Sequence, residues 1–225
     1  MTVQPLRQQA PVLDTALGLR CRARARAEGP APALAELRAG LGPDAVAWGP
    51  GGHALLPLDA AEAPGGAPVA TLGFASGDLG VWRDERHRDA ACGPWTAGVL
   101  WIRLGLTEQL LRTAADHLAG RRVGGEVLAD ISSVRTMLGE AAADLVEARL
   151  LLADGTAPDD PDGLAAPRAA DGLVRAQRTV LRLFGAAGYL DAGPGRLARA
   201  VDLLADVHPV AAEPATGRHA TEVSP

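Results

Sequence analysis

Apolar residues recur at helical spacing through the second half of the chain. The pattern predicts four helices, over residues 95–119, 128–153, 164–187 and 196–207. The second has the most regular stripe, whose members step by alternating threes and fours: Ile131, Val134, Leu138, Ala141, Leu145, Ala148 and Leu152. Such a stripe is typical of a helix that packs against antiparallel neighbours, so the second half is expected to form a four-helix bundle.

The first of these helices, residues 95–119, is apolar on two faces. One face carries Val99, Ile102, Leu106 and Leu110, and the other carries Leu100, Leu104, Leu111 and Leu118. A helix with two apolar faces is either buried centrally in its own chain or lies between a core and a subunit interface.

The first 90 residues follow a different pattern. Helices are predicted over residues 12–28 and 33–41, before a segment between Gly42 and Pro68 that is dense in Gly and Pro. Short apolar runs with turn-rich borders then predict strands of a small antiparallel sheet, at residues 46–48, 53–58, 69–74 and 80–82.

These elements predict a mainly α protein with three parts. Residues 1–90 form a small region of helices and short strands, and residues 91–208 form the four-helix bundle. Residues 209–225 are polar and contain Pro, which predicts a disordered tail. The acidic loop at residues 156–163 is interpreted as solvated rather than metal-binding, because no His cluster accompanies it.

Composition excludes several classes of chemistry. All 22 basic residues are Arg, so neither a Schiff-base lysine nor a phosphate-binding P-loop can form. The net charge of -5 with dispersed Arg argues against nucleic-acid binding. Cys21 and Cys92 form no zinc motif and are expected to be reduced. The chain has no apolar leader and no stretch that suits a membrane span, so a cytoplasmic location with no membrane partner is expected.

Two segments of the helical half resemble the C-terminal four-helix domain of the acyl-CoA dehydrogenase family. One is residues 100–155, in which RRVGG stands where the family has R-x-x-F-G. The other is residues 172–204, in which GAAGYLDAGPGRLAR is similar to the family's G-G-x-G-Y-x-x-E-x-P-x-x-R-x-x-R. Family members are longer chains, with a helical domain and a middle β-domain before the bundle. The resemblance therefore implies a shortened member with a degenerate site, whose residues 43–83 are a remnant of the β-domain.

The resemblance places the catalytic base of the family on a residue that cannot accept a proton. In GYLDAGP the position of the family's Glu is Ala192, and the neighbouring Asp191 is only a weak candidate for a displaced base. In one branch of the family the base comes from the first bundle helix, but the matching position lies near Trp95, and no carboxylate occurs between Asp89 and Glu108. No catalytic residue is therefore assigned.

The positions that hold FAD in the family are also altered. The resemblance implies cofactor-binding roles for Arg121, Arg122, Gly124, Gly185 and Gly188. The Phe of R-x-x-F-G is absent, and four further positions differ from the family pattern: Ile131–Ser132 for F-Q, Arg182 for Gln, Ala186 for Gly, and Ala200 for Asp. Together these changes predict that FAD is absent or shared with a partner chain.

Other candidate groups favour ordinary structural interpretations. His117 is expected to be exposed or interfacial, and His87 to lie in the solvated, charged linker DERHRD. Trp82, Trp95 and Trp101 are expected at the junction of the two regions, either as packing or as the lining of an aromatic pocket.

Three functions follow as hypotheses. The first is an acyl-CoA-dehydrogenase-like protein without the catalytic Glu, acting as a non-oxidative subunit or a repurposed scaffold in acyl or specialised metabolism. The second is an FAD-dependent oxidoreductase acting on the CH–CH bond of an acyl thioester together with a full-length partner chain. The third is shape-based binding or cyclisation of a small hydrophobic metabolite. The resemblance, together with the doubly apolar first helix, implies either a homo-oligomer or a hetero-oligomer with a flavoprotein dehydrogenase.

Overall fold

A computed structural model describes residues 13–42, 45, 47–60, 66–88, 93–154, 164–190 and 193–210. The expected mainly α fold is confirmed: six helices and two small sheets occur among these residues, with the bundle formed by α3 (Pro94–Ala119), α4 (Ser132–Asp154), α5 (Ala165–Phe184) and α6 (Pro194–Val207). The predicted helices agree with these bounds to within a few residues. The largest difference is at the start of α4, because residues 128–130 form a separate 3-10 turn.

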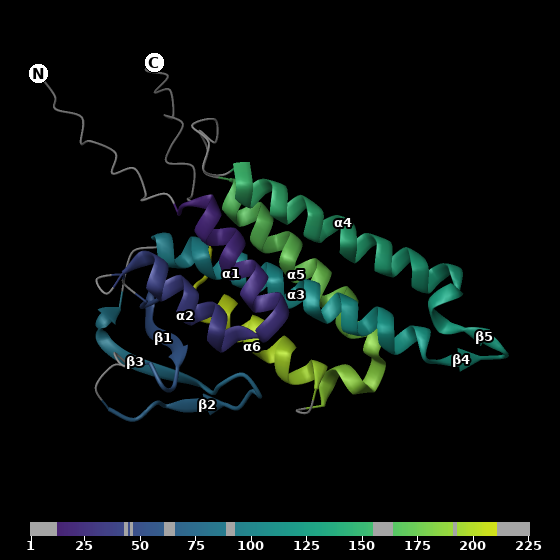
Figure 1. The fold of residues 1–225 in the computed structure, drawn as a ribbon, viewed down its shortest axis with the longest axis horizontal. Coiled ribbons are helices and arrows are strands. Elements are labelled where there is room, and N and C mark those ends of the chain that lie inside the picture. The colour runs from purple at the N-terminus through teal and green to yellow at the C-terminus, as the bar shows by residue number, and fades with distance from the viewer. Residues whose placement is uncertain are drawn as a thin grey trace, which may run out of the picture.

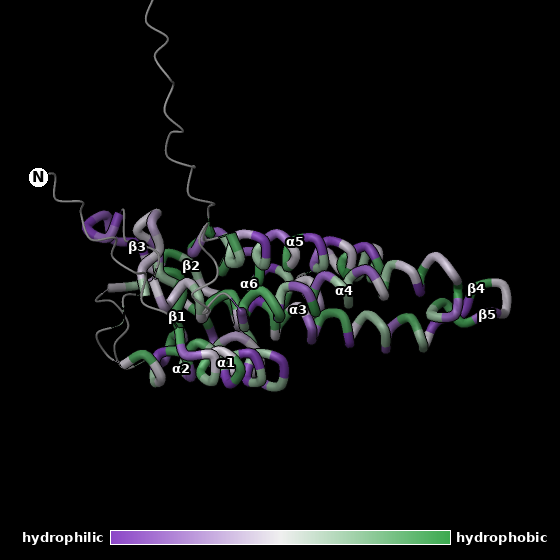
Figure 2. The backbone as a smooth tube through the Cα atoms, turned by 90° about the horizontal axis from the view of Figure 1, so that it is seen from above, coloured by the Kyte–Doolittle hydropathy of each residue, from purple (hydrophilic) through white to green (hydrophobic). Residues whose placement is uncertain are grey.

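The helix α3 is the centre of the molecule. Two further helices, α1 (Thr15–Glu28) and α2 (Pro30–Leu41), pack on one side of it, and α4, α5 and α6 contact its other sides. Figure 2 shows α1 and α2 as a separate layer below α3, with α5 above it. Both apolar faces of α3 are therefore covered within one chain. This resolves the two alternatives for the helix in favour of central burial, and its second apolar face gives no reason to expect association.

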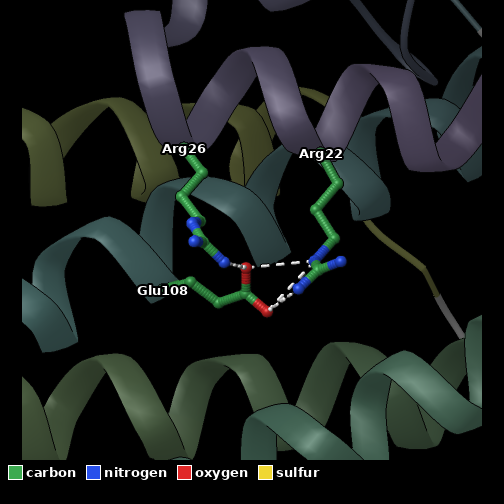
Figure 3. Close-up of polar contacts among 3 residues, drawn as sticks. All are labelled: Arg22, Arg26 and Glu108. Atoms are coloured by element: carbon green, nitrogen blue, oxygen red, sulfur yellow. Dashed lines mark hydrogen bonds and ion pairs between the residues drawn. The ribbon is translucent and has the colours of Figure 1, made fainter.

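The contact between α1 and α3 depends on glycine. A Cβ atom at Gly105 of α3 would lie 2.3 Å from the carbonyl oxygen of Arg22 on α1. A Cβ at Gly18 of α1 would lie 2.5 Å from the indole nitrogen of Trp101. Because no side chain separates the two backbones at Gly105, the helices approach closely enough for Arg22 to reach Glu108 one turn further along α3 (Figure 3).

A three-stranded antiparallel sheet covers one end of the bundle (Figure 1). Its strand order is β1–β3–β2, with β1 at Gly51–Pro57, β2 at Ala70–Leu72 and β3 at Leu79–Arg88. In β1, Ala54, Leu55 and Leu56 are buried and the strand contacts α2 and α6, so the sheet shares one core with the helices.

The strand β3 is much longer than the sequence predicts. The expected strand ended at Trp82, and the following charged residues were interpreted as a solvated linker. Instead β3 continues through Arg83–Arg88, with Gly51 of β1 opposite Arg88 across a bulge. His87 stacks on the indole of Trp48, with ring centroids 4.5 Å apart. The linker interpretation was wrong because a strand outside the core needs only backbone pairing on one side, which charged side chains do not prevent.

A two-stranded hairpin connects α3 to α4 and projects from the far end of the bundle (Figure 1). Its strands are β4 (Arg122–Val123) and β5 (Glu126–Val127), and the turn between them is Gly124–Gly125, with φ angles of 60° and 91°. Consecutive residues with positive φ are the geometry of a type I′ turn, in which glycine is preferred.

Candidate functional site

A cleft of about 420 Å³ lies where the sheet region meets the bundle. Four segments that are distant in the sequence line it: the α1–α2 junction, the loop between β2 and β3, the middle of α3, and the start of α6. Its apolar lining is Pro30, Phe74, Ala75, Leu110, Pro194 and Leu197, and its polar side chains are Glu28, Ser76, Gln109, Thr113 and Arg196. A mainly apolar hollow with a few convergent polar groups is the usual form of a small-molecule site.

Polar contacts fix the loop between β2 and β3 over the cleft. The backbone N–H of Phe74 donates to the carboxylate of Asp78 at 3.3 Å, and the N–H of Gly77 donates to the carbonyl of Phe74 at 3.2 Å. The guanidinium of Arg196, near the start of α6, donates to the carbonyl of Gly73 at 3.0 Å. This last bond joins the sheet region to α6 across the cleft.

Gln109 is one of the residues that line the cleft, and it carries a side-chain acceptor without a hydrogen-bond partner. Its side-chain oxygen is buried and has no partner among the described residues. The backbone carbonyl of the same residue accepts a bond from the hydroxyl of Thr113 at 2.9 Å. A buried acceptor without a donor is costly unless a ligand or water supplies one, so Gln109 favours a ligand that carries an N–H or O–H group.

Glu28 is the one carboxylate among the lining residues that the structure describes. It forms an ion pair with Arg24, four residues earlier on α1, and its side chain is 44% exposed. The hydrogen bond from Arg24 to Glu28 raises the pKa of the Arg24 guanidinium. Glu28 is thus a solvated carboxylate that is already paired with an arginine.

The residues at the family's base position, Asp191 and Ala192, lie outside the described residues. The two residues that follow them, Gly193 and Pro194, line the cleft. The motif and the cleft are therefore adjacent in the chain, although the sequence alone gave no indication that the sheet region would border the same cleft.

None of the residues predicted to hold FAD lines the cleft. Arg121, Arg122 and Gly124 are exposed at the hairpin, where Arg122 donates to the carbonyl of Gly125 at 3.0 Å. Gly185 and Gly188 lie in the 3-10 turn Gly185–Tyr189, which follows α5. The described residues of one chain thus do not bring this set together around the cleft, and the set remains a prediction.

His117 connects the two groups of predicted cofactor residues. Its ring contacts Arg121 at 3.4 Å, and its centroid lies 5.7 Å from that of Phe184, the residue before Gly185. The prediction of an exposed or interfacial His117 is partly met, since the ring is half-buried at this end of the bundle.

The tryptophans at the junction belong to the core. Trp95 and Trp101 are each 2% exposed and Trp82 is 4% exposed, and all three pack among buried hydrophobic residues. The indole of Trp82 donates to the carbonyl of Gly66 at 3.4 Å. This burial favours the packing interpretation over an aromatic ligand pocket.

Sequence reasoning missed two buried polar residues beside α6. Arg103 of α3 is 2% exposed, and burial lowers the pKa of its guanidinium to about 10, although Asp202 and Asp206 oppose this shift. His208, directly after α6, is 1% exposed, and burial lowers its pKa to about 4. The signal that was available for Arg103 is its place in an otherwise apolar stretch of α3, from Val99 to Leu106.

Within the described residues, no three or more His, Cys, Asp or Glu side chains are arranged to hold a metal ion. The described helices include none that is long and apolar enough to span a membrane.

Comparisons with known proteins give matches to solved structures alone, since no protein-family model and no curated protein matches the sequence. The chain is similar to a variant of the Tcur3481-Tcur3483 steroid ACAD, with 20% identity over 68% of this chain and 50% of that one, at a TM-score of 0.47. It is similar to the ChsE4-ChsE5 complex from Mycobacterium tuberculosis, with 19% identity over 64% and 46% of the two chains, at a TM-score of 0.45.

A third similar structure is an acyl-CoA dehydrogenase from Geobacillus kaustophilus, with 13% identity over 68% of this chain and 44% of that one, at a TM-score of 0.46. The present chain spans about half the length of each of these three chains.

Proposed function

We propose that this chain is an acyl-CoA-dehydrogenase-like scaffold that holds a largely apolar molecule in the cleft without dehydrogenating it through its own residues. It acts as a non-oxidative subunit or a repurposed binding protein in acyl or specialised metabolism. The observation that carries the proposal is the lining of the cleft, which combines apolar side chains with the free acceptor of Gln109 and one ion-paired carboxylate.

The chemistry of dehydrogenation explains why this lining is insufficient for that reaction. Removing a proton next to a thioester carbonyl requires a carboxylate that is poorly solvated and free to accept the proton. Glu28 is solvated and paired with Arg24, and the position of the family's Glu is Ala192, whose methyl group accepts no proton. The lining supports binding by shape, with Gln109 available to a donor on the ligand.

FAD is not part of the proposed activity. The residues that the resemblance implies for it lie at the hairpin and in the turn after α5, and none of them lines the cleft.

Two measurements on the purified protein test this proposal. Absorbance between the near ultraviolet and the blue reports bound flavin, and titration with a medium-chain acyl-CoA and with the corresponding free fatty acid reports binding. We expect no flavin band, saturable binding of at least one of the two compounds, and no reduction of an electron-transfer dye. Dye reduction by the isolated chain would overturn the non-oxidative proposal.

A pair of variants on α3 localises the binding. Thr113→Trp fills the cleft and should weaken binding at least tenfold, whereas Arg112→Trp, at the neighbouring exposed position outside the cleft, should leave it unchanged. Equal affinities of the two variants would place the ligand elsewhere.

A second candidate function is favoured by the hairpin. It projects from the bundle with Arg121 and Arg122 exposed, which suits a contribution to a flavin site on a partner chain (Figure 1). In that case the protein is part of an FAD-dependent oxidoreductase that acts on the CH–CH bond of an acyl thioester. Co-expression with a full-length flavoprotein dehydrogenase should then give activity that an Arg121→Ala/Arg122→Ala variant lacks.

A further inference from the structure

We propose that the molecule held in the cleft is an apolar chain that carries a hydroxyl group, and that Gln109 and Thr113 of α3 recognise this hydroxyl. The inference rests on the proposed function, because it assumes that the cleft binds a largely apolar molecule. It goes beyond that function by naming the polar group that distinguishes the ligand from an unsubstituted acyl chain.

The two recognising residues lie one turn apart on α3. Both line the cleft, and side chains at this spacing are neighbours on a helix surface. The hydroxyl of Thr113 donates to the backbone carbonyl of Gln109 at 2.9 Å, which ties the two residues together. One oxygen atom of a ligand that lies against this turn of the helix is therefore close to both side chains.

Thr113 offers the cleft an acceptor rather than a donor. A hydroxyl group has one hydrogen and two lone pairs, and the hydrogen of Thr113 is used by the backbone carbonyl of Gln109. The lone pairs of its oxygen remain, and Thr113 is exposed. A ligand group that bonds to Thr113 without breaking this contact must therefore supply a hydrogen.

The amide of Gln109 adds an acceptor and donors at the same turn. Its oxygen is buried and has no partner among the described residues, and its nitrogen carries two N–H donors. Because a buried acceptor without a donor is costly, rotation of this amide towards a ligand that supplies a hydrogen is favourable. The ligand group that matches Gln109 and Thr113 together is one that both donates and accepts.

A hydroxyl does both through a single atom and carries no charge. A carboxylate only accepts and an ammonium group only donates. The described lining has one negative side chain, Glu28, and one positive side chain, Arg196, so its charges favour neither ion. Both already have partners, since Glu28 pairs with Arg24. The guanidinium of Arg196 donates to the carbonyl of Gly73 at 3.0 Å.

The apolar part of the lining limits the ligand to few polar groups. Pro30, Phe74, Leu110 and Leu197 present no hydrogen-bonding side chain to the cleft. A further hydroxyl placed against them would lose its water partners without gaining new ones, which is unfavourable. The lining therefore suits a hydroxylated hydrocarbon chain rather than a sugar.

Titration of the full chain with three probes tests the inference. The probes are dodecanoate, β-hydroxydodecanoate and ω-hydroxydodecanoate, which place a hydroxyl at either end of the same chain. We expect one hydroxylated probe to bind about fivefold more tightly than dodecanoate, the gain from one net hydrogen bond. If neither binds more tightly, the inference is wrong, whereas the proposed function fails only if the medium-chain acyl-CoA also shows no saturable binding.

Variants of Thr113 assign the preference to its hydroxyl. Thr113→Val keeps the shape of the side chain and removes the oxygen, so the dissociation constants of the hydroxylated probe and of dodecanoate should become equal. Thr113→Ser retains the oxygen and should keep the preference. Thr136→Val is the matched control, because the hydroxyl of Thr136 also donates to a carbonyl one turn earlier, that of Ser132 at 3.1 Å, but lies outside the cleft. It should leave the ratio of the two dissociation constants unchanged.

A second variant keeps the inference testable if Thr113→Val does not fold. Gln109→Met removes the amide at similar side-chain length and should likewise reduce the preference, and thermal unfolding checks that each variant is folded. A folded Thr113→Val or Gln109→Met protein that retains the full preference contradicts recognition by this turn of α3. Equal losses of preference in Thr113→Val and Thr136→Val would place the hydroxyl elsewhere.

Discussion

Arg22 of α1 and Glu108 of α3 form a two-pronged ion pair that joins the outer helical layer to the centre of the bundle (Figure 3). The Nε atom of Arg22 lies 3.0 Å from both carboxylate oxygens, and its Nη2 atom lies 2.7 Å from one of them. Both side chains are largely buried, with exposed fractions of 19% and 16%, and Arg26 approaches the carboxylate at 3.9 Å. The pair shows that Glu108 has a structural role on the α1 side of α3.

Removing this carboxylate should destabilise the protein measurably. Glu108→Ala leaves the partly buried guanidinium of Arg22 without a partner, so we expect the free energy of unfolding to fall by about 2 kcal/mol. Glu147→Ala is the control, because Glu147 is 62% exposed and lies 3.8 Å from Arg175. It should change stability by less than about 0.5 kcal/mol. Urea denaturation measures both variants, and an equal loss in the free energy of unfolding for Glu108→Ala and Glu147→Ala would argue against the role of the Arg22–Glu108 pair.

The close approach of α1 to α3 should be sensitive to a single methyl group. Gly105→Ala places a Cβ atom 2.3 Å from the backbone oxygen of Arg22, and a backbone atom cannot move aside as the end of a side chain can. We expect a loss of about 2 kcal/mol in the free energy of unfolding.

Gly139→Ala on α4 is the matched control for this substitution. Nothing lies within 4 Å of its Cβ position, and Ala favours a helix over Gly, so it should stabilise the protein by about 0.5 to 1 kcal/mol. A Gly105→Ala variant as stable as the wild type would show that α1 can move away from α3 without cost.

His208 should make stability depend on pH in the mildly acidic range. Burial lowers its pKa from 6.5 to about 4 in the folded protein, so between these values the unfolded chain binds a proton that the folded chain does not. The stability that this group contributes is fully present above pH 6.5 and is lost as the pH falls towards 4. Between pH 7 and pH 5 the free energy of unfolding should fall by about 2 kcal/mol.

Urea denaturation of the wild type and of His208→Gln at the two pH values measures this contribution. The variant should lose less stability than the wild type between pH 7 and pH 5. An identical loss in the two proteins would mean that His208 is protonated in the folded protein without cost.

Cys21 should be chemically inert in the folded protein. Its thiol is fully buried in α1, and burial raises its pKa to about 12, so almost none of it is present as the reactive thiolate. The test uses a Cys92→Ser background and a disulfide reagent that releases a coloured thiolate when it reacts with a protein thiol. The native protein should show no reaction, and the denatured protein should show one reactive thiol per chain. Rapid reaction of the native variant would indicate that α1 opens away from α3.

The sequence by itself determined the helices whose apolar residues repeat at helical spacing. The stripe of α4 from Val134 to Leu152 predicts its helix, and the members from Ala141 onward are buried. The two faces of α3 predict a helix that is covered on several sides. The charged half of β3 could not be predicted in this way, because it is joined to β1 through Arg83 and Arg88 and has no apolar pattern of its own.

The candidate site was decided by tertiary structure. The motif around Gly193 and Pro194 is visible in the sequence, but the cleft also needs Phe74 from the sheet region, Gln109 from α3 and Glu28 from the end of α1. Burial of Arg103 and His208, and the hydrogen bond from Gln177 to Asp202, are likewise set by how the helices pack. A sequence pattern specifies which face of one element is apolar, whereas the meeting of several elements depends on close approaches such as that of Gly105 to Arg22, which no local pattern encodes.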